Sequence, residues 1–286
     1  MDFNFKSEIE DESLDGLQPN LLLLILGLLA LFVLPSFFFV ILALIMPQVD
    51  IDLLNYLGYF LGYGAYVAFL FMYLKKEKYQ KILKGFNKSN FYTALIFAVI
   101  LYLGSIATSN LVTLIFGEVS SNANQDSLNE SMMKYPLIVA LFSVIFAPIV
   151  EELVFRFTIF KSIAKKSRVL AYIVTVLSFA GIHFISSLSV LMMNLQDPLV
   201  VKDFAYQIFF DDLKSLPIYV VAALILTISY DINKNIATNI MIHAFYNLSQ
   251  VIMMLLFIFI VENSFDTSSL VFNQFNFDFI KNLLII

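Results

Sequence analysis

Ionisable side chains interrupt apolar stretches of the sequence. Glu151, Glu152 and Arg156 end one such stretch, and the two histidines of the chain, His183 and His243, lie inside two later ones. An ionisable group within a membrane span is costly to bury and usually serves a function. These residues therefore predict a polar site that is assembled from separate spans.

Helical spacing indicates which of these groups share a face. Glu152 and Arg156 are four residues apart, so they can form an ion pair that offsets the cost of burying either charge. Glu151 is rotated by about 100° from Glu152 and can point to another partner. His243 and Asn247 are also four residues apart, so one helical face presents an imidazole and an amide together.

The chemistry that fits these groups is the activation of water. A glutamate such as Glu151 in a dry pocket can act as a general base, and His183 can share and orient the same water. Asn247 and His243 can donate hydrogen bonds to a developing oxyanion. Phe179, one turn before His183, is placed to shield it or to contact a substrate. Together these groups predict the hydrolysis of an amide bond inside the membrane.

The composition excludes an ordinary water-soluble domain. The chain is 60% apolar and 14% charged, with a mean hydropathy of +0.86, whereas soluble domains carry about 25% charged residues. The net charge of −5 gives no basic excess for binding nucleic acid. The absence of cysteine excludes disulfides, thiol nucleophiles and thiolate metal sites. The chain is therefore expected to be a membrane protein with several spans.

Apolar runs long enough to cross about 30 Å of hydrocarbon recur along the chain. They predict an all-α bundle of about seven transmembrane helices, with six to eight as the range. The runs are Leu21–Met46, Leu53–Leu74, Phe91–Phe116, Leu137–Phe157, Val169–Met193, Leu216–Tyr230 and Ile236–Val261.

These runs divide the chain into four parts. Residues 1–20 are expected to be an acidic, disordered tail, and residues 262–286 form a second tail. Between them, residues 21–116 hold three N-terminal spans, and residues 137–261 hold a catalytic core of four spans.

Lysine and arginine in short loops predict the orientation, because they remain in the cytoplasm. Basic residues concentrate in segments 75–88 and 161–168, which puts the N-terminus inside. Glu151 is about 21 Å along the helix from Lys165, so the active site is expected in the cytoplasmic half or near the midplane. The high Phe, Ile, Asn and Lys usage is typical of bacteria with AT-rich genomes, which favours a bacterial cell membrane. Four of the 17 basic residues remain for the outer side: Lys134, Lys202, Lys214 and Lys281.

The order of these motifs resembles a known family of membrane proteases. Glu151-Glu152-xxx-Arg156, Phe179-xxx-His183 and His243-xxx-Asn247 are similar to the three motifs of the CPBP family, the CAAX-protease and bacteriocin-processing group that is also called Abi or Rce1-like. The HExxH motif of zinc proteases and the G-x-S-x-G motif of serine hydrolases are absent from the sequence.

The resemblance implies an intramembrane endopeptidase of the glutamic type. It assigns water activation to Glu151 and His183, and the oxyanion site to His243 and Asn247. Glu152 and Arg156 would position the site. The implied substrate is a peptide or a membrane-anchored protein, in CAAX processing, peptide maturation or bacteriocin immunity, and no cofactor is implied. The oligomeric state is not indicated.

Three alternatives stay open at this stage. Glu151, His183 and His243 offer a zinc ligand set with an open position for water. The protein can instead be an immunity or regulatory protein that binds a membrane partner without proteolysis. A transporter is the third alternative, but the two matching halves expected of one are not found in the sequence.

Overall fold

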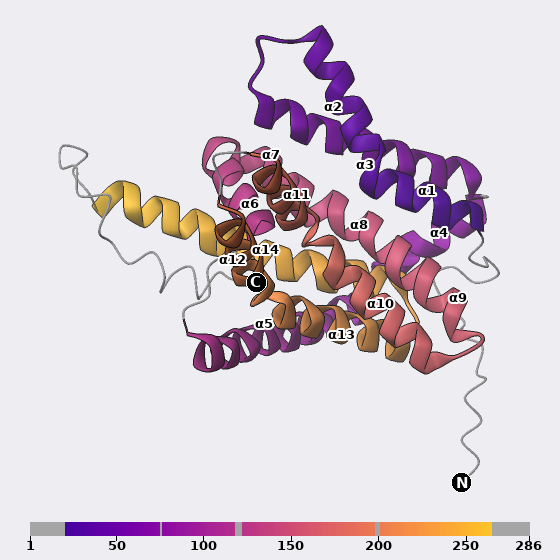
Figure 1. Ribbon diagram of the computed structural model, residues 1–286. Coiled ribbons are helices and arrows are strands. Elements are labelled where there is room, and N and C mark those ends of the chain that lie inside the picture. The colour runs from indigo at the N-terminus through magenta and orange to yellow at the C-terminus, as the bar shows by residue number, and fades with distance from the viewer. Residues whose placement is uncertain (1–20, 75, 118–121, 198–200, 265–286) are drawn as a thin grey trace.

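Every regular element is a helix in the part of the chain that this computed structural model describes, residues 21–74, 76–117, 122–197 and 201–264 (Figure 1). The predicted tail 1–20, and the second tail from residue 265 onward, lie outside the described residues. The helices are α1 Leu21–Phe32, α2 Leu34–Ile45, α3 Ile51–Tyr73, α4 Lys76–Gly85, α5 Lys88–Phe116, α6 Ala123–Lys134, α7 Pro136–Leu141, η2 Phe142–Phe146, α8 Ala147–Glu152, η3 Leu153–Phe160, α9 Lys161–Ala164, α10 Arg168–Ile182, α11 Ile185–Gln196, α12 Lys202–Leu213, α13 Leu216–Asn233 and α14 Ile236–Ser264.

The spans confirm the predicted multi-pass bundle. Five helices of the described chain are long and apolar enough to cross a membrane, and the number rises to seven if two bent helix pairs each count as one span. The first pair, α1 and α2, bends by 43°, and Pro35 lies in the first turn of α2, where proline is well tolerated. The second pair, α10 and α11, bends by 52° next to His183. The sixth span is longer than predicted, because α12 and α13 form one stretch, Lys202–Asn233.

The central span, Pro136–Ala164, contains two π-helical segments, η2 and η3, on either side of the paired glutamates. Pro148 lacks an N–H, and its ring would crowd the carbonyl four residues earlier, which belongs to Val144 in η2. In η3 the Thr158 hydroxyl donates to the Leu153 carbonyl at 2.8 Å. Such π segments occur frequently at functional sites, and here they set the direction in which the glutamates point.

Close backbone contacts hold α3 against α2. A Cβ atom added to Gly58 would lie 2.6 Å from the Pro35 carbonyl oxygen, and one added to Gly62 would lie 2.8 Å from the Pro35 nitrogen. Only glycine permits this approach, as in other membrane helix pairs with small residues four apart. The α3 helix is thereby fixed beside the central span, where it forms one wall of the site.

Helix α6 is fastened at both ends to different spans. At its start, the Asn122 side chain donates to the Ser215 hydroxyl at 3.1 Å, and the Ala123 N–H donates to Asp212 at 3.3 Å. At its end, Lys134 pairs with Asp52 of α3, and this hydrogen bond raises the pKa of the Lys134 ammonium. These contacts place α6 between α3 and the start of α13.

Candidate active site

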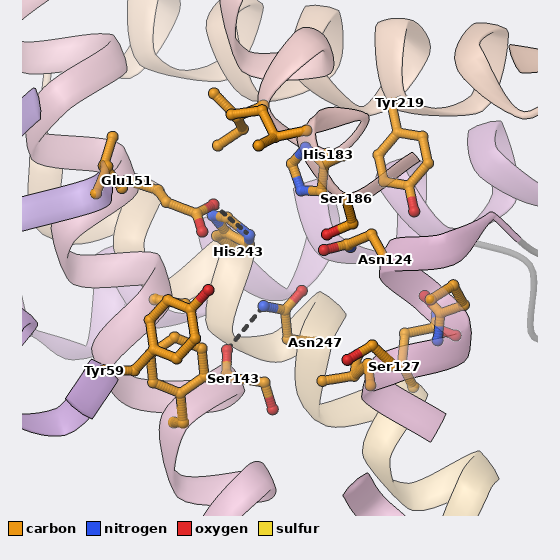
Figure 2. Close-up of a pocket in the computed structure, with 18 of the residues that line it drawn as sticks. Tyr59, Asn124, Ser127, Ser143, Glu151, His183, Ser186, Tyr219, His243 and Asn247 are labelled. Carbon is orange, nitrogen blue, oxygen red and sulfur yellow. Dashed lines mark hydrogen bonds and ion pairs between the residues drawn. The ribbon is translucent and has the colours of Figure 1, made fainter. Parts of the chain in front are cut away.

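A cavity of about 460 Å³ brings together five of the seven residues that the three sequence motifs single out, all except Glu152 and Arg156. Glu151 reaches it from α8, His183 from the end of α10, and His243 and Asn247 from α14 (Figure 2). Phe179 of α10 also lines it. Three helices that are distant in the sequence therefore meet around one space, as the sequence predicts for an intramembrane site.

Glu151 and His243 face each other across a short gap in this cavity. The Glu151 Oε2 atom lies 3.8 Å from the His243 Nε2 atom, and both side chains are largely buried. Figure 2 shows the Glu151 carboxylate beside His243, whereas His183 lies beside Tyr219. The ring centroids of His183 and Tyr219 are 4.5 Å apart. The structure therefore places His243, and not His183, next to the Glu151 carboxylate.

Glu152 turns away from the cavity into a dry polar network. Its Oε1 atom accepts from Arg156 Nη1 at 2.8 Å and contacts His243 Nδ1 at 2.9 Å, while its Oε2 atom accepts from Asn239 Nδ2 at 2.5 Å. Glu152, Arg156 and Asn239 are completely buried. The ion pair that the spacing predicted is present, and a buried pair is tolerated when such additional hydrogen bonds satisfy it.

Asn239 is the member of this network that the motif analysis missed. Besides Glu152, its amide group donates to the Leu226 carbonyl at 3.1 Å and accepts from the Ser229 hydroxyl. A signal was present in the sequence, because Asn239, His243 and Asn247 follow one another at intervals of four residues on α14. Asn is also common as packing glue between membrane helices, so this spacing alone does not separate a structural amide from a reacting one.

Hydrogen-bond partners assign the tautomers of both imidazoles. The Nδ1 atom of His183 lies 2.9 Å from the Phe179 carbonyl oxygen, which can only accept, so Nδ1 carries the hydrogen. The Nδ1 atom of His243 is held in the same way by the Glu152 carboxylate. In the neutral form of each ring, the Nε2 atom is then a proton acceptor. The Nε2 of His243 is the nitrogen that faces Glu151.

Two further side chains complete the described geometry. The Asn247 amide donates to the Ser143 carbonyl at 2.8 Å and keeps a second N–H. The Phe179 ring lies 4.2 Å from the Arg156 guanidinium carbon, and its centroid is 5.1 Å from that of His183. Phe179 thus separates the buried arginine from the cavity.

A zinc site does not fit this arrangement. Within the described residues, no three or more His, Asp or Glu side chains are grouped so that they could hold a metal ion. Glu151 and His243 are adjacent, but the third expected ligand, His183, is turned toward Tyr219. We therefore derive no chemical step through a metal.

Comparison with known proteins identifies the region that carries the site. Residues 133–249 match the family described as type II CAAX prenyl endopeptidase Rce1-like. This part of the chain, which is less than half of its length, is similar to that family. The matched residues include all four that are expected to react, from Glu151 to Asn247, and the description of the family names an endopeptidase.

A curated protein is also similar to part of the chain. The UPF0177 protein YvdC of Lactococcus lactis subsp. lactis (strain IL1403) is 36% identical over 84 residues, which cover 29% of this chain and 32% of the relative. The matched segment thus spans about a third of the length of that relative. No solved structure matches the chain.

Proposed function

We propose that this protein is an intramembrane endopeptidase that hydrolyses a peptide bond with water activated by Glu151. The observation that carries the proposal is the pair of glutamates with opposite environments. Glu151 faces the cavity beside His243, while Glu152 is saturated by hydrogen bonds from Arg156, His243 and Asn239. One carboxylate is left available for chemistry, and its neighbour fixes the groups around it.

The gap between Glu151 and His243 suits one water molecule. Water can donate to Glu151 Oε2 and His243 Nε2 at once, because two hydrogen bonds of about 2.8 Å easily span the 3.8 Å between these atoms. In the attack, the water oxygen bonds to the peptide carbonyl carbon and one water proton passes to Glu151. When the C–N bond breaks, Glu151 returns this proton to the leaving amine. Glu152 keeps the His243 ring in the required tautomer.

Asn247 is the proposed oxyanion donor, through the amide N–H that Ser143 does not occupy. This arrangement differs from the family pattern, which pairs Glu151 with His183 and gives His243 to the oxyanion. The His243 Nε2 atom can donate only if the ring is charged, since its hydrogen is already committed to Glu152 at Nδ1. We therefore propose that His243 binds and orients the water. His183, on another wall of the cavity, would serve as a second proton acceptor.

The setting and substrate class of this reaction are part of the proposal. The family description supports a CAAX-type peptide or membrane-anchored protein substrate, and the spans support a multi-pass membrane protein. The bacterial cell membrane is proposed from the residue usage of the sequence alone. We propose that the reaction needs no metal or other cofactor.

Quantitative peptidomics of membranes and medium tests the proposal. A deletion strain is complemented with wild type, with Glu151→Gln, or with Glu130→Gln, a matched change at an exposed glutamate outside the cavity lining. Peptides or new C-termini should appear with wild type and Glu130→Gln at equal protein levels, and should be lost with Glu151→Gln. If all three peptidomes match while each variant rescues the deletion phenotype, the protein acts by binding a membrane partner, and the protease proposal fails.

A further inference from the structure

The active-site cavity extends from the middle of the bundle toward one of its ends. The lining residues lie mainly in the first half of three helices, at 55–63 in α3, at 142–151 in the central span and at 218–226 in α13. In α10 they lie at the end of the helix, at 179–182, and in α14 they lie in its middle, at 243–254. Since α10 runs in the opposite direction to α13, its end and the first halves of the other three helices belong to the same side of the bundle.

Basic residues gather at the other ends of these helices. Lys88 begins α5, Lys165 follows α9, Arg168 begins α10 and Lys234 follows α13. Helix α4 also belongs to that side, because a Cβ atom on its last residue, Gly85, would lie 2.7 Å from Ala237 in the first turn of α14. Figure 1 shows α4 and α9 at one end of the bundle and α6, α11 and α12 toward the other. The basic end and the cavity end are therefore opposite.

The α6 side of the cavity is its more exposed side, since Ser127 is exposed whereas Glu151 and His243 are buried, and the wall there is largely polar and uncharged. Figure 2 shows Asn124 and Ser127 of α6 and Ser186 of α11 on the side of the space away from Glu151. The α6 lining consists mainly of amide and hydroxyl side chains, with two apolar residues beside them: Asn124, Gln125, Ser127, Leu128, Asn129 and Met132. Amide groups both donate and accept, which suits pairing with the backbone of an extended peptide.

Lysine-rich ends of spans remain in the cytoplasm, so the α6 end faces the outside. We propose that the cavity admits its substrate from the extracytoplasmic side, as a peptide segment of an exported or outward-facing polypeptide that lies along α6. This inference rests on the proposed protease function for the substrate, but the direction of access is independent of it. It differs from the sequence-based expectation of an active site in the cytoplasmic half or near the midplane, because the cavity lining extends from Glu151 toward α6, at the end opposite the basic residues.

Serine-to-cysteine variants can test the direction of access, because the chain contains no cysteine. Ser127→Cys and Ser186→Cys place thiols in the cavity lining, and Ser89→Cys and Ser162→Cys place them at exposed positions on the basic end. A small, charged, membrane-impermeant methanethiosulfonate is added to intact and to permeabilised cells. The cavity variants should be labelled equally in both, and the control variants only after permeabilisation. Labelling does not depend on proteolysis.

The origin of the cleaved peptides tests the substrate class. Peptides that require Glu151 should derive from exported proteins or from outward-facing segments. Cavity thiols that react only after permeabilisation, or that never react, overturn the direction of access. If the cavity thiols are labelled in intact cells but the peptides that require Glu151 derive from cytoplasmic proteins, the proposed substrate class is overturned. If the cavity thiols are labelled in intact cells but no peptide requires Glu151, the direction of access is supported and the protease function is overturned.

Discussion

Two asparagines on α14 provide the sharpest test of the proposed division of roles. Asn239 lies in the dry network with Glu152, Leu226 and Ser229, whereas Asn247 lines the cavity and contacts Ser143. The same substitution, Asn→Ala, should therefore damage stability at Asn239 and catalysis at Asn247.

The magnitudes follow from the contacts. Hydrogen bonds between membrane helices contribute about 0.6–1.7 kcal/mol each, and Asn239 makes three contacts of this kind. Asn239→Ala should thus lower the free energy of unfolding by about 2–4 kcal/mol, or the Tm by roughly 5–15 °C. Asn247→Ala loses one such contact, so its stability should fall by only about 1 kcal/mol. Its turnover number should fall roughly 100- to 1000-fold, as when an oxyanion donor is removed.

The assay compares both purified variants with wild type in lipid nanodiscs. The chain lacks tryptophan and cysteine, so far-UV circular dichroism is the suitable probe of thermal unfolding. Turnover is measured on a substrate identified by the peptidomics, well below the Tm and at equal folded concentration. A wild-type Tm for Asn239→Ala would refute the structural role of the network, and wild-type turnover for Asn247→Ala would refute the oxyanion assignment.

Three further predictions concern the reacting pair, the metal alternative and the α2–α3 contact. Glu151→Gln and His243→Asn should each abolish most of kcat. The double variant should be no slower than the worse single variant, because the losses in kcat from two residues that act on one water are not additive. Additive losses would show that the two residues have independent roles. Incubation with EDTA should leave kcat unchanged, and a loss that added zinc restores would revive the metal alternative. Gly58→Ala should destabilise the bundle by about 1–3 kcal/mol, since its Cβ would lie 2.6 Å from the Pro35 carbonyl oxygen. Gly64→Ala should be tolerated, because no atom lies within 4 Å of the added Cβ. Equal Tm values for the two variants would contradict this packing argument.

The reacting residues that line the cavity were visible in the sequence, because ionisable groups stand out in apolar runs. The pairing of those residues was less predictable. A spacing argument assumes a constant rotation per residue, but His183 lies just beyond the end of α10, where the chain bends by 52° into α11. Its ring is thereby carried toward Tyr219, and helical phase no longer predicts its partner.

The contribution of the first two spans was not predictable from motifs. Tyr59 and Tyr63 of α3 line the cavity opposite the central helix, yet tyrosines in an apolar run give no chemical signal of their own. Their position depends on the close approach of α3 to α2 at Gly58 and Gly62. The cavity is therefore built from both predicted parts, 21–116 and 137–261, and from α6 between them, although only the second part carries the motifs.

The location of the Glu152–Arg156 pair on one helix has a consequence for how the protein is made. A single charged residue at the centre of a span opposes insertion by about 2.5–3.5 kcal/mol, and the other partners of Glu152 lie 87 and 91 residues later in the chain. Arg156 acts as a counter-ion that the nascent helix carries with it, so this segment can enter the bilayer before the rest of the bundle exists. The network closes only when α14 arrives with Asn239 and His243. Synthesis of α14, the last of the described spans, thus becomes the step that completes the site, and under the proposed function a chain without α14 is inactive.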